Sequence, residues 1–406
     1  ITNDESVKVY LPSEKLKEGE VLEFDATAYD LLQTINVEWP CLSFDIIKDN
    51  LGENRTEFPL TLYFAAGTQA DQAVNNKILF IKLSNLYKTS SQDDSDDGIE
   101  YDEVEEDPIL RDSFIKHPFG IINRIRVAPH KSEILSVWGD DGSVRMFNAS
   151  EQIKYIESST KRAAPFNVKP LFTFSGHPCE GFAMDWSTVK QGRFASGDCS
   201  KQVYLWEPTE DGLWSICETP FVGHESSVED LQWSPSEPNA LASCSSDKTI
   251  KIWDARQKSR CAISVRAHQC DVNVISWNKL VSYLLVSGGD DGEFKVWDLR
   301  TFGAKALPIA TFKWHTDAIT SVEWHPCDES VLAVSGADDQ ISLWDLSLEE
   351  DYEVSSPEEQ SKIPAQLLFV HQGQNHIKEA HWHPQVPGLL ASTAASGINV
   401  FKTINI

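Results

Sequence analysis

Serine, histidine and aspartate recur together in this chain, and together they are the residue types of a hydrolytic triad. In such a triad the histidine takes the proton of the serine that attacks the substrate. Two sets, each with a tryptophan, are His224, Ser243, Asp247 and Trp253, and His268, Ser287, Asp291 and Trp297. A nucleophile is needed only once, whereas this trio recurs. We therefore interpret each set as a buried tetrad whose polar groups hydrogen-bond one another as they leave water, and predict no catalytic residue and no enzyme.

Tryptophans follow four histidines at two fixed distances, nine and 29 residues later. The histidines are His177, His224, His268 and His315; the first tryptophans are Trp186, Trp233, Trp277 and Trp324, and the second are Trp206, Trp253, Trp297 and Trp344. Two spacings that persist through four copies indicate a repeat. Its unit of roughly 45 residues is typical of a propeller blade.

The clearest unit covers residues 222–254 and contains three predicted strands. The third strand ends in Trp253-Asp254, the pair of residues that defines the WD repeat, one blade of a β-propeller. Two other units depart from the tetrad. The third has Ser200 where the aspartate is expected, and the sixth has Val334 where the serine is expected.

Looser copies complete the count of blades. One opens near His117, a seventh near Gly373, and residues 58–87 form a degenerate first blade. Residues 26–35 follow a plausible N-cap, Asp25, and carry a helical stripe of apolar residues, which predicts a short helix. Residues 41–47 are predicted to be a strand that completes the last blade and closes the ring.

The predicted fold is thus all-β: a seven-bladed WD-repeat propeller with an N-terminal α-helix and acidic loop insertions. We expect residues 1–57 to form an N-terminal extension and residues 58–406 the propeller, with insertions at 89–112 and 348–364. We also expect a monomer.

Composition excludes several classes of protein. No segment approaches the roughly 18 apolar residues that a membrane span needs, and no signal-peptide pattern is present at the N-terminus. Eight cysteines without CxxC spacing indicate reduced thiols. The only His-x-His pair, His381 and His383, lacks a cysteine or carboxylate set beside it, and no glycine-rich phosphate loop occurs. The sequence therefore predicts no metal and no cofactor.

Charge is the most informative property of the composition. The net charge of −27 argues against direct nucleic-acid binding, which needs a basic surface, and favours basic protein partners. Residues 93–107 hold ten carboxylates and residues 349–359 hold six, with no lysine or arginine in either run. Solvated, disordered loops are one interpretation of such runs. The other, which we favour, is that two insertions of one sign bind a cationic ligand.

Several stretches resemble a known family. The acidic insertion after Trp344-Asp345 and the segment leading into Glu38-Trp39-Pro40 resemble the histone-binding, retinoblastoma-associated WD-repeat branch. Within that branch, residues 9–12, 23–29 and 36–49 and the acidic stretch before the second blade resemble the glutamate-rich WD-repeat family of ribosome-biosynthesis regulators.

This resemblance implies a function and a site. It implies a nuclear and nucleolar chaperone, shuttling with the cytoplasm, that holds newly made large-subunit ribosomal protein three until it joins the pre-60S particle. In the histone-binding relatives a basic helix lies between the N-terminal helix and the acidic insertion of the sixth blade. Carried over to this chain, the partner-binding candidates on the helix are Tyr29, Leu32 and Gln33, and those on the second acidic run are Glu349, Glu350, Asp351, Glu358 and Glu359. The charge of the first run adds Asp93, Asp94, Asp96, Asp97, Glu103, Glu105 and Glu106.

Two other functions stay open. A histone escort would use the same acidic surfaces. A substrate receptor of a cullin ubiquitin ligase would use the WDxR motifs that end in Arg256 and Arg300.

Overall fold

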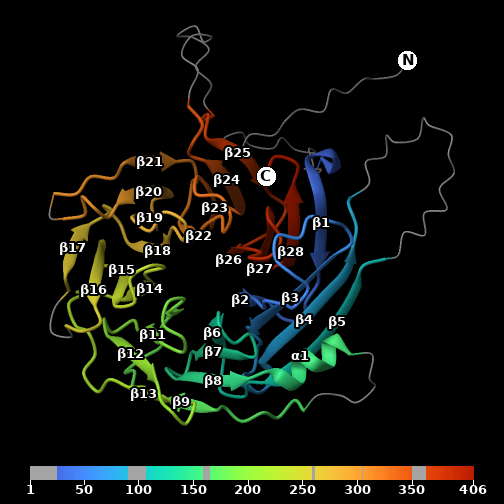
Figure 1. Ribbon diagram of the computed structural model, residues 1–406, viewed down its shortest axis with the longest axis horizontal. Helices are drawn as coiled ribbons and strands as arrows, with labels where there is room; N and C mark the ends of the chain where they lie inside the picture. Colours follow the sequence, from blue (N-terminus) through green and yellow to red (C-terminus); the bar gives the residue numbers. More distant parts are fainter. Residues whose placement is uncertain (1–24, 90–106, 159–164, 258–260, 304, 350–362) are drawn as a thin grey trace, which may run out of the picture.

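Seven four-stranded antiparallel sheets are arranged around a central axis in the computed structural model (Figure 1). The structure describes residues 25–89, 107–158, 165–257, 261–303, 305–349 and 363–406. The prediction of a seven-bladed propeller is confirmed.

The strands of each blade are given from the centre of the ring outward. The first three blades are β2 (Cys41–Ile46), β3 (Leu60–Thr68), β4 (Lys77–Leu86) and β5 (Ile109–Lys116); β6 (Ile122–Val127), β7 (Ile134–Gly139), β8 (Val144–Asn148) and β9 (Phe172–Phe174); and β10 (Ala183–Trp186), β11 (Phe194–Gly197), β12 (Val203–Pro208) and β13 (Trp214–Ile216). The fourth and fifth are β14 (Val228–Trp233), β15 (Ala240–Ser245), β16 (Thr249–Asp254) and β17 (Ile263–Arg266); and β18 (Val272–Trp277), β19 (Leu284–Gly289), β20 (Glu293–Asp298) and β21 (Ala310–Lys313). The sixth and seventh are β22 (Ile319–Trp324), β23 (Val331–Gly336), β24 (Gln340–Asp345) and β25 (Leu367–His371); and β26 (Glu379–Trp382), β27 (Leu389–Ala394), β28 (Gly397–Thr403) and β1 (Tyr29–Ile35).

Apolar side chains fill the spaces between adjacent blades. Strand residues alternate between the two faces of a blade, so each blade offers one apolar face to each neighbour. The cluster between blades four and five, for example, joins Ala242 and Ile250 to Val272 and Ile275. The four repeat tryptophans on the third strands, Trp206, Trp253, Trp297 and Trp344, are at most 1% exposed. The repeat spacing therefore reflects burial.

Ring closure differs from the prediction in two ways. The predicted helix over residues 26–35 is wrong: only Ala26–Ala28 form a single 3-10 turn, capped by the side chain of Asp25, and β1 follows as a strand. The predicted closing strand, 41–47, is also wrong, because β2 is the innermost strand of blade one. Instead β1 pairs with β28, with Leu32 opposite Phe401 and Ile35 opposite Ile398 (Figure 1). The open edge of β28 supplies backbone hydrogen bonds that outweigh a weak helical preference.

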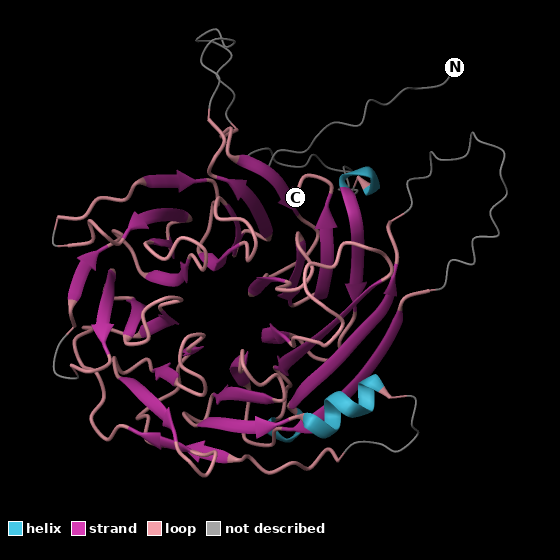
Figure 2. Ribbon diagram, viewed as in Figure 1, coloured by secondary structure: helices cyan, strands magenta, loops and turns pink. Residues whose placement is uncertain are grey.

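One α-helix occurs among the described residues, α1 (Ser150–Glu157), which lies on the outer side of the ring beside β4 and β5 (Figure 2). It buries Gln152 and Ile156. Within the described part of the chain, no helix has the length and apolar character needed to cross a membrane.

Candidate partner-binding site

The predicted tetrad of blade four forms a closed hydrogen-bond chain. His224 Nδ1 lies 2.8 Å from Asp247, His224 Nε2 lies 2.6 Å from Ser243 Oγ, and Trp253 Nε1 donates to the same Oγ at 2.7 Å. The histidine is 4% exposed and the serine is fully buried. A serine with no access to solvent and two polar partners cannot meet a substrate, so the chemistry of a triad has no place here.

The two incomplete tetrads are completed from other positions. In blade three, Asp198 replaces the missing aspartate and lies 2.7 Å from His177 Nδ1. In blade six, Ser342 of β24 replaces the missing serine of β23: its Oγ lies 2.8 Å from both His315 Nε2 and Trp344 Nε1. Because Ser342 lies opposite Val334 in the sheet, the hydroxyl reaches the same point in space from the neighbouring strand.

The inner strands enclose a central cavity of about 420 Å³ lined by charged groups. Glu379 of β26 joins blade seven to the next two blades. It accepts hydrogen bonds from Ser43 Oγ at 2.8 Å and Phe44 N at 3.0 Å, and it pairs with Arg126 at 3.0 Å and with Arg124. Burial alone would raise the pKa of Glu379, yet the two arginines hold it well below its usual range.

A histidine continues this network toward blade six. His381 lies 3.0 Å from Glu323 and 3.4 Å from Glu379. Although burial alone would lower it, the hydrogen bonds to these carboxylates raise the pKa of His381 to about 9. A protonated imidazole has no lone pair for a metal. These charges are paired with one another, so we assign them to closure of the ring rather than to a ligand.

The outer strands of blades six and seven meet at a partly exposed apolar surface, which we call the β1–β25 interface. Tyr29 of β1 packs edge-on against Phe369 of β25 with ring centroids 5.2 Å apart. The interface comprises the partly buried residues Ala28, Leu32, Leu368, Phe369 and Ile406. Ile404, which is 59% exposed, adjoins it through a hydrogen bond from its N–H to the carbonyl of Ala28.

Both acidic runs begin or end beside this interface. Before the first run, Thr89 lies on the outer edge of β1: its N–H donates to Asp30 O, and Leu32 N donates to its hydroxyl, both at 2.9 Å. Before the second run, the carbonyl of Leu348 accepts a hydrogen bond from the Gln366 side chain at 2.8 Å. Strand β25 follows directly. Two acidic runs, some 250 residues apart in sequence, are thus attached to one apolar surface.

The predicted partner-binding residues fall into three groups. Tyr29 is only 7% exposed, and its hydroxyl is bonded to His371, so its side chain belongs to the core. Leu32 and Gln33 are half-buried on β1, and Glu349 is exposed. The other predicted carboxylates lie outside the described residues: Asp93, Asp94, Asp96, Asp97, Glu103, Glu105, Glu106, Glu350, Asp351, Glu358 and Glu359.

Sequence reasoning missed the apolar part of this surface. Leu368, Phe369, Ile404 and Ile406 were not among the predicted site residues. Their segments carry no local signal beyond that of ordinary strands, because the surface forms only when β1 lies beside β25.

Comparison with known proteins places the chain in a class. Residues 215–254, 259–298 and 306–345 match the family model "WD domain, G-beta repeat", and residues 19–87 match a family model described as "Histone-binding protein RBBP4" and a component of the CAF1 complex. The second match contains β1, β2, β3 and β4. Fold and comparison together define a WD-repeat propeller protein with an N-terminal segment of the histone-binding type.

Three relatives match almost the whole chain. They are "Glutamate-rich WD repeat-containing protein 1" of Dictyostelium discoideum (47% identical; 96% of this chain and 83% of the relative), "Protein HEAT STRESS TOLERANT DWD 1" of Arabidopsis thaliana (45%; 98% and 92%) and "Ribosome assembly protein rrb1" of Schizosaccharomyces pombe (44%; 97% and 84%). The chain belongs to this family of glutamate-rich WD-repeat proteins, which confirms the resemblance noted from its sequence.

Proposed function

We propose that this protein is a non-enzymatic escort of a basic ribosomal protein during assembly of the large ribosomal subunit. Its client, by the resemblance of the N-terminal sequence, is ribosomal protein three, which it delivers to the pre-60S particle in the nucleus and nucleolus. The name of the fission-yeast relative, a ribosome assembly protein, supports the process. The observation that carries the proposal is the attachment of both acidic runs beside the apolar β1–β25 interface.

The arrangement suits a cationic, amphipathic segment. Leu32, Leu368 and Ile404 offer apolar contacts, while sixteen carboxylates in the two runs attract lysine and arginine from either side. Opposite charges speed association and exclude partners of the wrong sign. Apolar contacts supply an attraction that salt does not screen.

Release follows from the same electrostatics. Ribosomal RNA is a polyanion with one charge per nucleotide, so it competes with the acidic runs for the basic groups of the client. The escort then needs no nucleotide to let its client go.

The experiment measures binding of the purified full-length chain to the ribosomal protein across a range of salt concentrations. One variant changes every Asp and Glu in 93–106 and 349–359 to Asn or Gln. We expect its affinity to fall by at least about tenfold and its salt dependence to become shallower. A matched control neutralises Glu210, Glu218 and Asp290, which are exposed on blades three and five, and is expected to bind normally.

A second variant separates charge from apolar contact. Leu32→Ser with Leu368→Ser should weaken binding at all salt concentrations, whereas Leu307→Ser, at a residue 79% exposed elsewhere on the ring, should not. Unchanged binding by both the neutralised and the double-serine variants would refute the proposed site.

Histones are the second candidate client, because the family model that matches residues 19–87 is a histone-binding one. Competition between core histones and the ribosomal protein for the purified chain decides between them. If histones displace the ribosomal protein at equal concentration and the reverse fails, the histone escort is the better assignment.

The ubiquitin-ligase receptor would depend on Arg256 and Arg300, whose side chains are 73% and 63% exposed. Each guanidinium is paired with the aspartate of its own WD motif. Should Arg256→Ala with Arg300→Ala abolish function in cells while the neutralised runs have no effect, the receptor function would replace the escort.

A further inference from the structure

The tetrad of blade five differs from the other complete tetrads at its outer end. In blades three, four and six the histidine Nδ1 lies 2.7–2.9 Å from its aspartate. In blade five His268 Nδ1 lies 4.0 Å from Asp291 Oδ1 and has no hydrogen-bond partner, although the His268 side chain is completely buried. A buried polar atom without a partner is costly, so this one calls for a physical reason.

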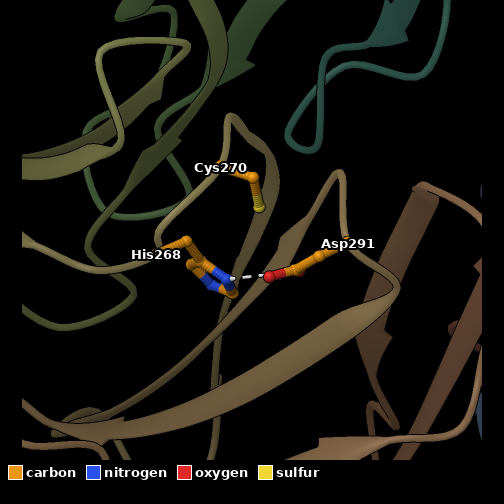
Figure 3. A group of neighbouring side chains, drawn as sticks. All are labelled: His268, Cys270 and Asp291. Carbon is orange, nitrogen blue, oxygen red and sulfur yellow. Dashed lines mark ion pairs between the residues drawn. The ribbon is translucent and has the colours of Figure 1, made fainter.

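A thiol lies in the gap between these two residues. The side chains of His268, Cys270 and Asp291 converge (Figure 3), and one donor atom from each lies within 4.8 Å of the others. They meet over the bare Cα of Gly289. A Cβ on this glycine would lie 2.7 Å from His268 Nδ1 and 3.0 Å from both Asp291 Oδ1 and Cys270 Sγ. The absence of a side chain at Gly289 thus leaves a small space that three different donor atoms face.

We propose that His268, Cys270 and Asp291 form a site for a divalent transition metal of the zinc type. Imidazole, thiolate and carboxylate are all zinc ligands, and thiolate favours zinc over magnesium or calcium. Zinc bonds are about 2.0–2.3 Å long, so the donors must move inward by under roughly 1 Å. Cys270 and Asp291 are only half-buried on loop and turn residues, and they can make this movement.

The charges and hydrogen bonds of the surroundings fit a bound ion. Thiolate and carboxylate together neutralise a dication. Burial lowers the pKa of His268 to about 4, so the imidazole is neutral and can offer the lone pair of Nδ1. Its Nε2 then carries the proton and donates to Ser287 Oγ, 2.8 Å away, a second contact that fixes the ring. The nearest cation, Lys295, is paired with Glu293 and bonded to the carbonyl of Ala267.

Blade three supplies an internal control. Cys179 also lies two residues after its tetrad histidine, but there His177 Nδ1 is already bonded to Asp198. The same spacing of histidine and cysteine is therefore expected to bind no metal in blade three.

The experiment titrates the full-length chain, stripped of metal and kept reduced, with Co²⁺ and then Zn²⁺. We expect a single site with thiolate-to-cobalt charge-transfer absorption, which Zn²⁺ abolishes by displacement. Cys270→Ser should remove this absorption and weaken binding of Zn²⁺ by at least about tenfold, since it loses the soft ligand. Cys179→Ser should leave both unchanged.

Further measurements keep the outcome decisive. Asp291→Asn, which retains the shape of the side chain, should weaken binding while the absorption persists at higher cobalt concentration. Circular dichroism checks that each variant is folded. The proposal is overturned if Zn²⁺ does not bind at micromolar concentration, or if the absorption survives Cys270→Ser and disappears in Cys179→Ser.

Discussion

The hydroxyl of Tyr29 lies 2.8 Å from Nδ1 of His371, although 342 residues separate them in the chain. Burial lowers the pKa of His371 to about 4, so the imidazole is neutral and accepts the hydroxyl proton. The histidine also stacks on Phe401 of β28, with ring centroids 4.0 Å apart. This pair therefore fastens the closing strand β1 to both the sixth blade and the last strand of the chain.

Tyr29→Phe removes the hydroxyl and keeps the ring. We expect the free energy of unfolding to fall by about 1 kcal/mol, the usual worth of a buried hydrogen bond. Tyr29→Ala should cost about 3–5 kcal/mol, because it also leaves a cavity at the closure, and hydrogen exchange in β28 should accelerate. Urea unfolding measures both. Tyr87→Phe, at a residue 44% exposed, is the control and should change little. Equal effects of the two phenylalanine variants would contradict the role of the Tyr29 hydroxyl.

Glu379→Gln breaks the ion pairs that join blade seven to blades one and two. It leaves the arginines of blade two without their counter-charge in the cavity, so we expect destabilisation by about 3–5 kcal/mol. Glu151→Gln breaks the exposed pair with Lys154, whose side chains are 61% and 70% exposed, and should cost about 0–1 kcal/mol. Denaturant unfolding compares them. Similar losses for both variants would show that Glu379 does not lock the ring.

Stability should fall between pH 6.5 and 9 because of His381. Its pKa rises from 6.5 to about 9 on folding, so the folded state holds a proton that the unfolded state has lost in this window. The expected decrease, on the order of 1–3 kcal/mol, should be absent from His381→Gln, while exposed His130→Gln should retain it. Glu323, Glu379, Arg126 and Asp45 are the charged groups around His381. Unfolding midpoints measured across this pH range test the prediction. A wild-type curve that is flat there would contradict it.

The opposite sign applies on the acid side. Burial lowers the pKa of His371 to about 4 and that of His383 to about 3, so the unfolded state binds these protons first as the pH falls below 6.5. Stability should decline there in the wild type and in His381→Gln alike. This shared decline separates the two windows in the same experiment.

Ser342→Ala should destabilise blade six as much as Ser243→Ala destabilises blade four. Each change leaves the Nε2 of a buried histidine and the indole N–H of a buried tryptophan without their shared oxygen, at a cost of about 1–3 kcal/mol. Ser215→Ala, on the exposed side of β13, should be nearly neutral. Thermal unfolding of the three variants decides the matter. If Ser342→Ala resembled the exposed control, Ser342 would not complete the tetrad.

The sequence by itself determined the repeat, the number of blades and the chemical character of the partner. Burial requires the histidine and tryptophan of each WD repeat at fixed strand positions, so their spacing, as from His224 to Trp253, is visible in one dimension. Net charge is a sum over residues and needs no fold, so the preference for a basic partner could be inferred from the acidic runs.

Only the tertiary structure decided which strand closes the ring and which residues surround the site. Leu31, Leu32 and Ile35 fit a helical stripe or a strand equally well over so short a segment, and the open edge of β28 made the choice. Likewise a tetrad needs an oxygen at one point in space, which Ser342 supplies from a strand that the repeat pattern does not indicate. The β1–β25 interface has the same origin, because its two strands lie at opposite ends of the chain and meet only when the ring closes.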